Sequence, residues 1–579
     1  MERRRYLFGP VDDGYALDNL GEARASGECK VFAPSGRPDV LVRHGDAWED
    51  VLARLPDGWG PDFLVLFLAY RTIPPALWEA PLPRIGLAAD WDVLWHRYRH
   101  AIPRCDLVFT DARGVRLLRR AGATNGEHGN LFGCARPFLD DRPPAERDID
   151  VLYVGSLHPA HKRERLPWLG RVVRALGDDW NVVVRTDVDR VEYLELLRRA
   201  RIVFNRSVRG ECNLRTFETV AAGGLLFQEA ENEEVRRYLR PADECVLYTG
   251  ATVEPLLRRY LADEPERARI AAAGRARAAS FGFAELWRGM LETIDERRPD
   301  LVGLSGEGDE LLHRFWETFT ASTGPDRCCD ADDETIERLE AALERRRRPE
   351  LHLLLGLAIA RRAQRLERFD RACVADVARR FRQAVHLAPT RPIFRLDLAE
   401  ALWRLGRESE AALECRRALD DLNRADALAP GDLELAHFPP AFDTFRVEWE
   451  RAAWADADER SAKRRLVRWR LHSLLATLTD DLAHYRAAAS LRDDLWVSHA
   501  ALGRALVRAG RPSEGAEHLR RAAELNPFDE RLLPELLGAL RATGDDGRAR
   551  AAAEELRLLR RAAPTTNGGT VAYAQEVVA

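Results

Sequence analysis

The sequence lacks several features that would assign it to a special class of protein. Its nine cysteines form no C-x-x-C pair, and Cys328 and Cys329 are adjacent, a spacing that rarely makes a structural disulfide. We therefore expect reduced thiols and a cytoplasmic protein. The longest apolar run, Phe63 to Tyr70, falls far short of the ~20 residues that cross a bilayer. The opening residues, Met-Glu-Arg-Arg-Arg-Tyr-Leu-Phe, lack the apolar region of a signal peptide, so we expect neither a signal peptide nor a membrane span.

An excess of charge of one sign is also missing. The 579 residues include 89 Lys and Arg against 94 Asp and Glu, for a formal net charge of -5, and this balance argues against nucleic acid as a partner. The densest basic run, Arg345 to Arg348, is typical of a solvated helix end. The composition, 46% hydrophobic and 32% charged, is that of a folded globular protein, and the length predicts three or four domains.

The first 300 residues alternate short apolar runs with helical stretches. Because the apolar runs are continuous, with no period-two alternation, they indicate strands that are buried on both faces of parallel sheets. The predicted strands of the first series are Tyr6–Phe8, Phe63–Leu68, Ile85–Ala89 and Asp106–Thr110. After a linker rich in proline and charge, Asp140 to Asp148, a second series begins. Its predicted strands are Ile149–Val154, Asn181–Val184, Arg201–Phe204, Leu225–Phe227 and Cys245–Tyr248.

These patterns predict an α/β protein with two doubly wound, Rossmann-like domains, followed by an all-α region. From about residue 350 the strand patterns stop, and small residues recur at a period near 34 that is typical of tetratricopeptide repeats, clearest from 493 to 560. The predicted boundaries are an N-terminal Rossmann-like, acceptor-side domain over 1–145, a second Rossmann-like domain over 146–300, a helical connector over 301–349, a helical repeat region over 350–562 and a loose tail over 563–579.

One segment, Gly210 to Gly224, is denser in polar groups than the start of a buried helix needs. It lies between two predicted strands of the second series, and it contains Asn213, Arg215, Thr216 and Glu218. Helix amides together with an arginine can hold phosphate, and one carboxylate can accept two sugar hydroxyls. The segment therefore predicts a site for a nucleotide-activated substrate.

The region from Asp148 to about Glu296 resembles the donor-binding domain of CgeB-like glycosyltransferases, which belong to the two-domain GT-B class (glycosyl transferases group 1 type). The resemblance rests on three blocks that occur in order: Arg-Asp-Ile-Asp-Val-Leu-Tyr-Val-Gly155, Ala-Arg-Ile-Val-Phe-Asn-Arg-Ser207, and Asn213-Leu-Arg-Thr-Phe-Glu218 with Gly223. It implies a hexosyltransferase-like enzyme that uses a nucleoside-diphosphate sugar as donor and needs no metal and no cofactor. The spaced pair Asp187 and Asp189 is interpreted as a turn or helix cap rather than a metal site.

The resemblance also implies donor-binding roles for particular residues. Glu218 would bind the ribose hydroxyls, and the alternative is a carboxylate that merely favours the N-terminus of its helix. Arg215 would contact the diphosphate, with a surface arginine as the alternative, and Thr216 is a further candidate donor-binding residue. Asn205, Ser207 and Asn213 would line the pocket or satisfy loop backbone. Many related enzymes carry two glutamates eight positions apart, whereas Glu211 and Glu218 are seven apart, so no role is assigned to Glu211.

Two further groups are candidates on weaker patterns. Lys162, Arg163 and Arg165 follow a predicted strand and would form a phosphate clamp or an exposed helix start. Asp90, at a strand end of the first domain, is the candidate catalytic base, with His96 behind it; helix capping is the alternative for Asp90.

The sequence thus predicts a glycosyltransferase that acts on a protein or glycan acceptor, with a repeat scaffold that recruits the acceptor or a protein partner. The alternatives are a catalytically silent scaffold that acts through its repeats, and a sugar-phosphate hydrolase or epimerase on the same frame.

Overall fold

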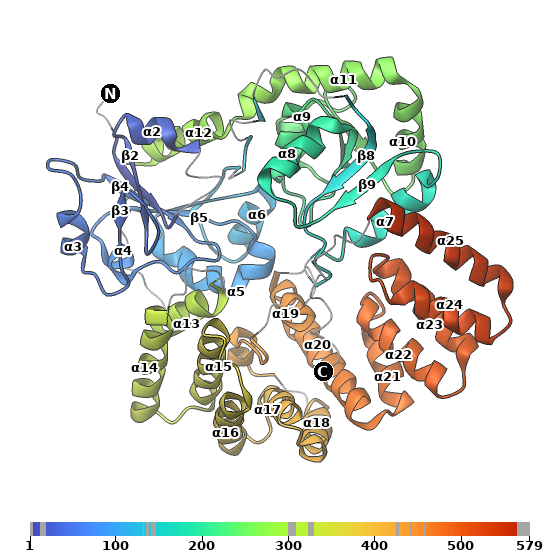
Figure 1. Ribbon diagram of the computed structural model, residues 1–579. Coiled ribbons are helices and arrows are strands. Elements are labelled where there is room, and N and C mark those ends of the chain that lie inside the picture. The colour runs from blue at the N-terminus through green and yellow to red at the C-terminus, as the bar shows by residue number, and fades with distance from the viewer. Residues whose placement is uncertain are drawn as a thin grey trace. The chain divides into compact units, whose positions relative to one another are not determined.

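A computed structural model of the chain describes residues 4–11, 19–130, 132–134, 138–139, 146–160, 162–298, 301, 309–321, 329–423, 428–440, 443–454 and 458–563 (Figure 1). The predicted loose tail lies outside these residues beyond Ala563, and residues 140–145 of the predicted linker lie outside them too.

The chain divides into two compact units, and each unit joins two separate stretches of sequence. Unit 1 is Met1–Leu131 with Arg288–Asp480, and unit 2 is Phe132–Trp287 with Asp481–Ala579. The chain therefore passes between the units three times. The predicted domains followed one another along the sequence, whereas the helical region predicted over 350–562 is in fact shared between the two units.

The sheet of unit 1 has seven parallel strands in the order β3-β2-β1-β4-β5-β6-β7, and this is the strand order of a Rossmann fold extended by one strand. Three of its strands, β2, β3 and β7, were not predicted, because they are short or carry polar residues. The strands are β1 Tyr6–Gly9, β2 Cys29–Ala33, β3 Val40–Leu41, β4 Phe63–Phe67, β5 Arg84–Leu87, β6 Leu107–Thr110 and β7 Gly126–His128.

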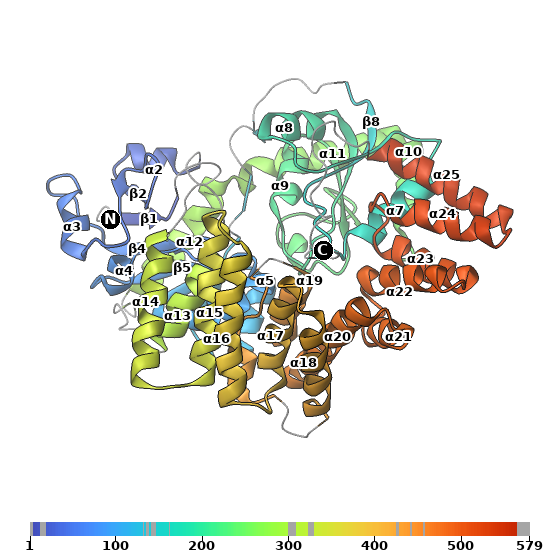
Figure 2. The same cartoon turned by 60° about the horizontal axis from the view of Figure 1, so that its bottom comes forward.

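The helices of unit 1 fall into two sets. Those between the strands are α2 Gly21–Ala25, α3 Trp48–Ala53, α4 Pro75–Glu79, α5 Trp91–Ala101 and α6 Ala112–Arg120. Those of the later stretch are α13 Glu310–Thr320, α14 Cys329–Arg345, α15 Pro349–Arg365, α16 Arg371–Leu387, α17 Pro392–Arg404, α18 Glu408–Asp421, α19 Thr444–Trp454 and α20 Glu459–Thr479. Figure 2 shows α14 to α18 side by side as successive hairpins.

The later helices of unit 1 pack on its α/β part through α5. Both α13 and α19 contact α5. The ring of Trp91 meets that of Trp454 edge to face at 4.9 Å, and the indole of Trp454 donates to the backbone oxygen of Asp92 at 3.0 Å. Large aromatic surfaces of this kind dominate the energy of packing, so this helical set is part of the core of unit 1.

The sheet of unit 2 has five parallel strands in the order β12-β11-β10-β8-β9, the order of flavodoxin-like folds. Each was predicted from its apolar run. The strands are β8 Ile149–Val154, β9 Val182–Arg185, β10 Ala200–Phe204, β11 Leu225–Glu229 and β12 Val246–Tyr248.

The helices of unit 2 also form two sets. Those of the α/β part are α7 Leu166–Leu176, α8 Arg190–Arg199, α9 Leu214–Ala221, α10 Val253–Ala262, α11 Glu264–Arg277 and the first part of α12 Phe283–Arg297. Those of the later stretch are α21 Leu482–Leu491, α22 Trp496–Arg508, α23 Pro512–Leu525, α24 Leu532–Ala542 and α25 Asp546–Ala562.

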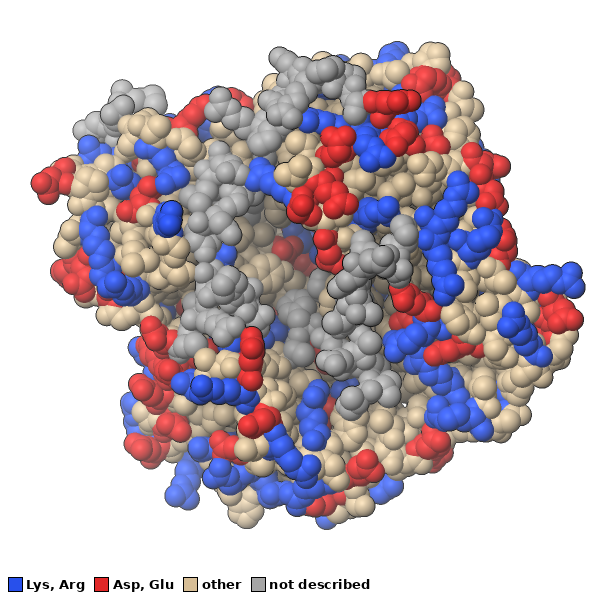
Figure 3. All heavy atoms as spheres, in the orientation of Figure 1, with Lys and Arg blue, Asp and Glu red and all other residues tan. Residues whose placement is uncertain are grey.

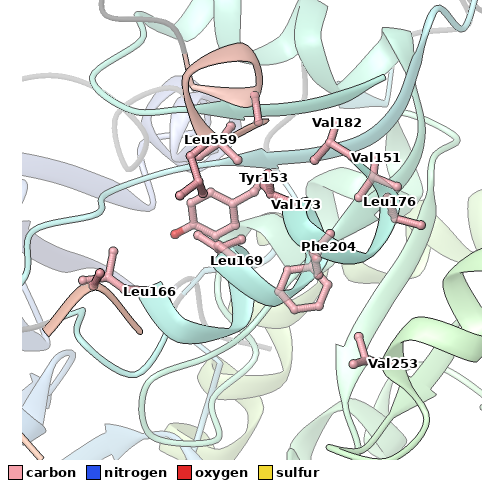
Figure 4. Packing of buried hydrophobic residues seen from close by; sticks show 14 of the residues in the cluster. Val151, Tyr153, Leu166, Leu169, Val173, Leu176, Val182, Phe204, Val253 and Leu559 are labelled. Atoms are coloured by element: carbon pink, nitrogen blue, oxygen red, sulfur yellow. The ribbon is translucent and has the colours of Figure 1, made fainter. Parts of the chain in front are cut away.

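A single hydrophobic core joins these two sets of helices. It runs from the strands of unit 2 through α7 into α22 to α25, and Figure 4 shows Leu559 of α25 among side chains of β8 and α7. Two ion pairs fasten the same contact, because Glu555 accepts from Arg174 at 2.9 Å and Asp178 accepts from Arg557 at 2.5 Å. These last helices are therefore integral to unit 2.

None of the helices within the described ranges is both long and apolar enough to span a bilayer. On the face shown in Figure 3, basic side chains lie among acidic ones, as the near balance of the two in the sequence leads one to expect.

The contact between α7 and the last helices can be tested at a glycine. A Cβ at Gly170 would lie 2.8 Å from a ring carbon of Pro527, so Gly170→Ala should separate the two elements and destabilise unit 2 by about 1–3 kcal/mol. Gly538 lies inside α24 with nothing within 4 Å of a Cβ, so Gly538→Ala should instead stabilise the chain by about 0.5–1 kcal/mol. Thermal unfolding of the two variants measures both effects, and equal shifts would contradict the packing described.

Candidate functional site

In the sheet of unit 2, the direction in which successive strands are added reverses at β8. The next strand in sequence, β9, lies on one side of β8, and β10 lies on the other. In open parallel sheets the carboxyl ends of strands at such a switch point form the place where ligands bind. Here those ends are Val154 with Gly155, and Phe204 with Asn205.

Arg215 of α9 connects these two strand ends. Its Nε donates to the backbone oxygen of Val154 at 2.6 Å, and its Nη1 donates to Oδ1 of Asn205 at 2.8 Å. Its guanidinium carbon lies 4.4 Å from the centre of the Tyr153 ring, and its side chain is buried. A Cβ at Gly155 would lie 1.9 Å from Nη2, so only glycine admits the guanidinium here. The predicted alternative, a surface arginine, is thus wrong.

Helix α9 begins at the same place because its first residues satisfy its free amides. Asn213 is the N-cap, and its Oδ1 accepts from the backbone N–H of Thr216. The helix ends after Ala221, and Gly223 follows with a φ of 75°, a conformation that favours glycine. The N-terminus of α9, with its positive end of the helix dipole, therefore faces the carboxyl end of β10.

The predicted pocket residues form one hydrogen-bonded network around Asn205. The amide nitrogen of Asn205 donates to Asn213 and Thr216, at 3.1 Å each, and to Gln228 at 2.8 Å. Asn205 and Thr216 are completely buried. These side chains hold the strand end and the helix start together, and the pocket-lining role predicted for them stays a prediction.

Two of the three predicted clamp residues gather with Arg215 around Tyr153. Burial would raise the pKa of Tyr153, but Arg165, Arg215 and Lys162 outweigh this effect and lower that pKa. Arg165 is buried and also donates to the backbone oxygen of Arg206 at 2.8 Å. Three basic side chains thus surround Tyr153, while Glu211 and Glu229 lie close enough to Arg165 to help raise its pKa against the effect of burial.

Arg163 points elsewhere. Its Nη1 lies 3.0 Å from Oδ2 of Asp494, which lies between α21 and α22 of unit 2. This ion pair fastens the loop after β8 to those helices, and the structure does not bring Arg163 to the cluster around Tyr153.

Ser207 belongs to a neighbouring acidic cluster. Its hydroxyl and its backbone N–H both donate to Glu229, at the carboxyl end of β11. Burial raises the pKa of Glu229, while the hydrogen bond from Ser207 opposes this effect. Glu211 is buried too, and its carboxylate accepts from the backbone N–H of Arg209 at 3.0 Å. Ser207 therefore fixes a loop to the sheet.

Glu218 lies on α9 with its carboxylate almost completely buried. Its Oε2 accepts from the hydroxyl of Tyr193 on α8 at 2.8 Å. Burial raises the pKa of Glu218 to about 7, although Tyr193 and Arg215 act in the opposite direction. A carboxyl group that titrates near neutral pH next to a switch point is typical of a functional site.

The sequence did not single out Tyr153, Tyr193, Gln228 or Glu229. Gln228 and Glu229 did carry a signal, because they are polar residues that end an apolar strand run next to the motif. The two tyrosines carried none. Tyr153 reads as one more apolar residue of β8, and Tyr193 reaches Glu218 across 25 positions of the sequence.

The two candidate residues of unit 1, His96 and Asp90, differ in how deeply the structure buries them. His96 is completely buried, its Nδ1–H donates to Oε2 of Glu450 at 2.7 Å, and its Nε2 lies 2.9 Å from Nζ of Lys463. A general base must reach the substrate, so this position does not support the catalytic role predicted for His96; the residue anchors α5 to α19 and α20.

Asp90, in contrast, lies only part-buried beyond the carboxyl end of β5. It occupies the N-cap position of α5, but its side chain makes no capping hydrogen bond there. Asp189, by comparison, caps α8 by accepting from Glu192, as the cap interpretation of that residue predicts. Among the described residues, no three His, Cys, Asp or Glu side chains are grouped as metal ligands would be.

The fold and the site together define a class of protein, one with doubly wound domains built on parallel sheets. One of these domains presents a buried cluster of cationic side chains and a helix N-terminus at its switch point. Comparison with known families then gives a narrower result. Residues 144–281 match the family described as glycosyl transferase-like. A search of curated proteins finds no match.

The chain is also similar to several solved structures. Sucrose-phosphate synthase from Thermosynechococcus elongatus is 14% identical over 52% of this chain and 100% of its own, with a TM-score of 0.33. HepE from Anabaena, in complex with UDP and glucose, is 12% identical over 50% and 99%, with a TM-score of 0.38. WaaG, a glycosyltransferase involved in lipopolysaccharide biosynthesis, is 14% identical over 50% and 99%, with a TM-score of 0.37.

The raised pKa of Glu218 predicts a pH dependence of stability. Between its ordinary pKa of 4.5 and about 7, the unfolded chain has released this proton while the folded chain keeps it, so stability falls as pH rises through this window. Glu218→Gln removes the effect. The difference in Tm between this variant and the wild type should therefore shift in favour of the variant from pH 5 to pH 7, by an amount equivalent to roughly 1–3 kcal/mol in the free energy of unfolding. Glu195→Gln, at an exposed position of α8, is the control and should track the wild type. A constant difference between Glu218→Gln and the wild type would contradict the prediction.

Proposed function

We propose that the chain is a GT-B glycosyltransferase that moves a sugar from a nucleoside-diphosphate sugar to a protein or glycan acceptor. The observation that carries the proposal is the position of Arg215: a buried guanidinium held across the two strand ends of the switch point, with Arg165 and Lys162 around the same tyrosine.

This cluster suits the leaving group of the reaction. When the bond between the sugar and the diphosphate breaks, negative charge develops on the diphosphate, and prearranged cations and helix amides stabilise it. Arg215 is held in place by two hydrogen bonds before any ligand binds, so little reorganisation is needed. The N-terminus of α9 adds backbone N–H groups and its dipole at the same strand end. The reaction would then proceed without a metal or another cofactor.

Glu218 suits the nucleoside. It lies one turn further along α9 than Arg215, and its carboxylate is already oriented by Tyr193. A carboxylate can accept hydrogen bonds from both ribose hydroxyls, and it does so best when ionised. Donor affinity should therefore increase as pH rises through about 7.

The acceptor side is assigned to unit 1, where Asp90 would serve as the base. The later helices would recruit the acceptor or a protein partner. Their hairpins are built like those of repeat proteins, with small residues where helices approach: a Cβ at Gly503 would lie 2.8 Å from a side-chain carbon of Leu519.

The donor site can be tested by calorimetric titration of the full chain with UDP, GDP and ADP. Arg215→Ala should lower the affinity for the preferred diphosphate at least 30-fold, because it removes both the cation and the link between the strand ends. Arg174→Ala is the matched control. It removes an ion pair with Glu555 at the contact between α7 and α25, and it should change affinity less than about twofold.

A wild-type chain that binds none of the three diphosphates would overturn the proposal. If the same chain nevertheless captures a protein partner through residues 350–562, the catalytically silent scaffold becomes the better account.

Gly155→Ala tests the position of Arg215 without touching the arginine. The new methyl group would occupy the place of Nη2, so the guanidinium must leave the switch point and diphosphate affinity should fall at least tenfold. Gly155 also has a φ of 146°, so backbone strain needs a control. Gly122→Ala introduces strain at a φ of 89° with nothing within 4 Å, and it should leave affinity unchanged. Equal affinities of Gly155→Ala and the wild type would show that diphosphate binds elsewhere.

A further inference from the structure

Helices α22 and α23 of unit 2 approach each other closely because a glycine of one helix faces a glycine of the other. A Cβ at Gly515 would lie 2.8 Å from the backbone oxygen of Gly503, so a side chain at this position would force the two helices apart. About one turn from this contact lie His499 on α22 and His518 on α23. The close approach of the two backbones thus brings the two histidines together.

The two imidazole rings meet nitrogen to nitrogen. The Nδ1 atoms of His499 and His518 lie 3.1 Å apart, and the ring planes are 22° from parallel. Nε2 of His499 lies 3.0 Å from the backbone oxygen of Asp493. Because a carbonyl oxygen can only accept a hydrogen bond, this Nε2 carries the hydrogen, and the lone pair of the neutral ring is on Nδ1. That lone pair faces His518, whose own Nδ1–H donates to it.

This arrangement has the geometry of two metal ligands. Imidazole nitrogens bind Zn²⁺ at about 2.0–2.1 Å, so two nitrogens on one ion, at angles from a right angle to the tetrahedral angle, lie roughly 2.9–3.4 Å apart. The observed distance of 3.1 Å falls within this range. A histidine that binds a metal commonly donates its other ring N–H to a backbone carbonyl, which fixes its tautomer and orientation, and Asp493 provides this contact for His499.

The surroundings favour the form of histidine that binds metal. Burial lowers the pKa of both His499 and His518, so both rings are neutral at neutral pH, as a metal ligand must be. The charged groups that act on the pair are the carboxylates of Asp493, Asp494, Glu514 and Glu517, which raise these pKa values, and the guanidinium groups of Arg486 and Arg521, which lower them.

Two of these carboxylates are engaged by arginines. Asp494 pairs with Arg492 at 2.7 Å, and Glu514 pairs with Arg511. Within the part of the chain that the structure describes, no third His, Cys, Asp or Glu completes a set of ligands with the two histidines. An ion at this place would therefore take two ligands from the protein and the others from water.

We propose that His499 and His518 bind a divalent transition-metal ion, such as Cu²⁺ or Zn²⁺, that bridges α22 and α23. The ion takes the place of the proton between the two Nδ1 atoms, and the ring of His518 carries its hydrogen on Nε2 instead. The two histidines are 19 positions apart and meet only in the folded hairpin, so binding stabilises the folded state. The same two helices share the hydrophobic core with α7, so the ion strengthens a part of unit 2 that supports its sheet.

The test is a calorimetric titration of the metal-free, reduced full chain with Cu²⁺, Ni²⁺, Zn²⁺ and Mg²⁺. Cu²⁺ should bind most tightly, Ni²⁺ and Zn²⁺ more weakly, and Mg²⁺ not at all, because imidazole suits the transition metals whereas Mg²⁺ prefers oxygen. His518→Ala should lower the affinity for Cu²⁺ and Zn²⁺ at least about tenfold. His386→Ala is the matched control, since it removes an exposed histidine from α16 of unit 1, and it should leave both affinities within about twofold.

Two further measurements guard against a variant that is merely less stable. The EPR spectrum of the Cu²⁺ complex should show hyperfine coupling to two imidazole nitrogens in the wild type and to one in His518→Ala. Zn²⁺ should raise the Tm of the wild type and of His386→Ala, but not that of His499→Ala or His518→Ala. Far-UV circular dichroism checks that each variant keeps its helices.

The outcomes that would overturn the inference are distinct. Equal Cu²⁺ affinity in the wild type and His518→Ala, or a wild-type spectrum without two imidazole nitrogens, would leave the pair as a hydrogen bond that joins two helices. A loss of binding in His386→Ala as large as that in His518→Ala would place the ion elsewhere. None of these results depends on diphosphate binding, so the inference and the proposed function stand or fall separately.

Discussion

The side chain of Asn205 is the contact on which the arrangement at the switch point of unit 2 depends. It is completely buried at the end of β10, and its amide joins the N-cap of α9, the first turn of that helix, the end of β11 and the guanidinium of Arg215. Burying an amide costs free energy unless its polar atoms are hydrogen-bonded, so the bonds that Asn205 makes also hold its partners in place. The consequence is a cation whose position is fixed by the sheet. Arg215 is presented to the switch point as part of the fold, not as a mobile surface side chain.

The two units use strand ends in different ways. In unit 2 the carboxyl ends carry cations and a helix N-terminus, which suit a diphosphate. In unit 1 the chain beyond two strand ends carries Tyr70 and Asp90 in a left-handed conformation, and the tyrosine hydroxyl donates to the carboxylate. This division of chemistry follows from the shared architecture, since parallel strands place all of their carboxyl ends at one edge of a sheet.

The sequence predicted what depends on local pattern. The buried strands of unit 2, the motif from Asn213 to Glu218 and the cap at Asp189 could all be read from neighbouring residues. Contacts made across the chain could not. Tyr193 and Tyr70 carry no local signal, and His96 looked like a site residue only because its partners, Glu450 and Lys463, are more than 350 positions away. The helical hairpins were predictable from small residues at fixed spacing, but nothing in that spacing says on which sheet each hairpin packs.

The integration of the later helices into both cores has a consequence for how this chain can be divided. A fragment that ends after the second sheet would leave α5 without α13 and α19, and α7 without α23 and α25. The exposed faces would include Trp91 on one helix and Leu169 and Val173 on the other, apolar surface that favours aggregation. Gene fragments, circular permutants and domain swaps of this chain would have to respect three chain crossings, because each α/β part folds together with its own set of later helices.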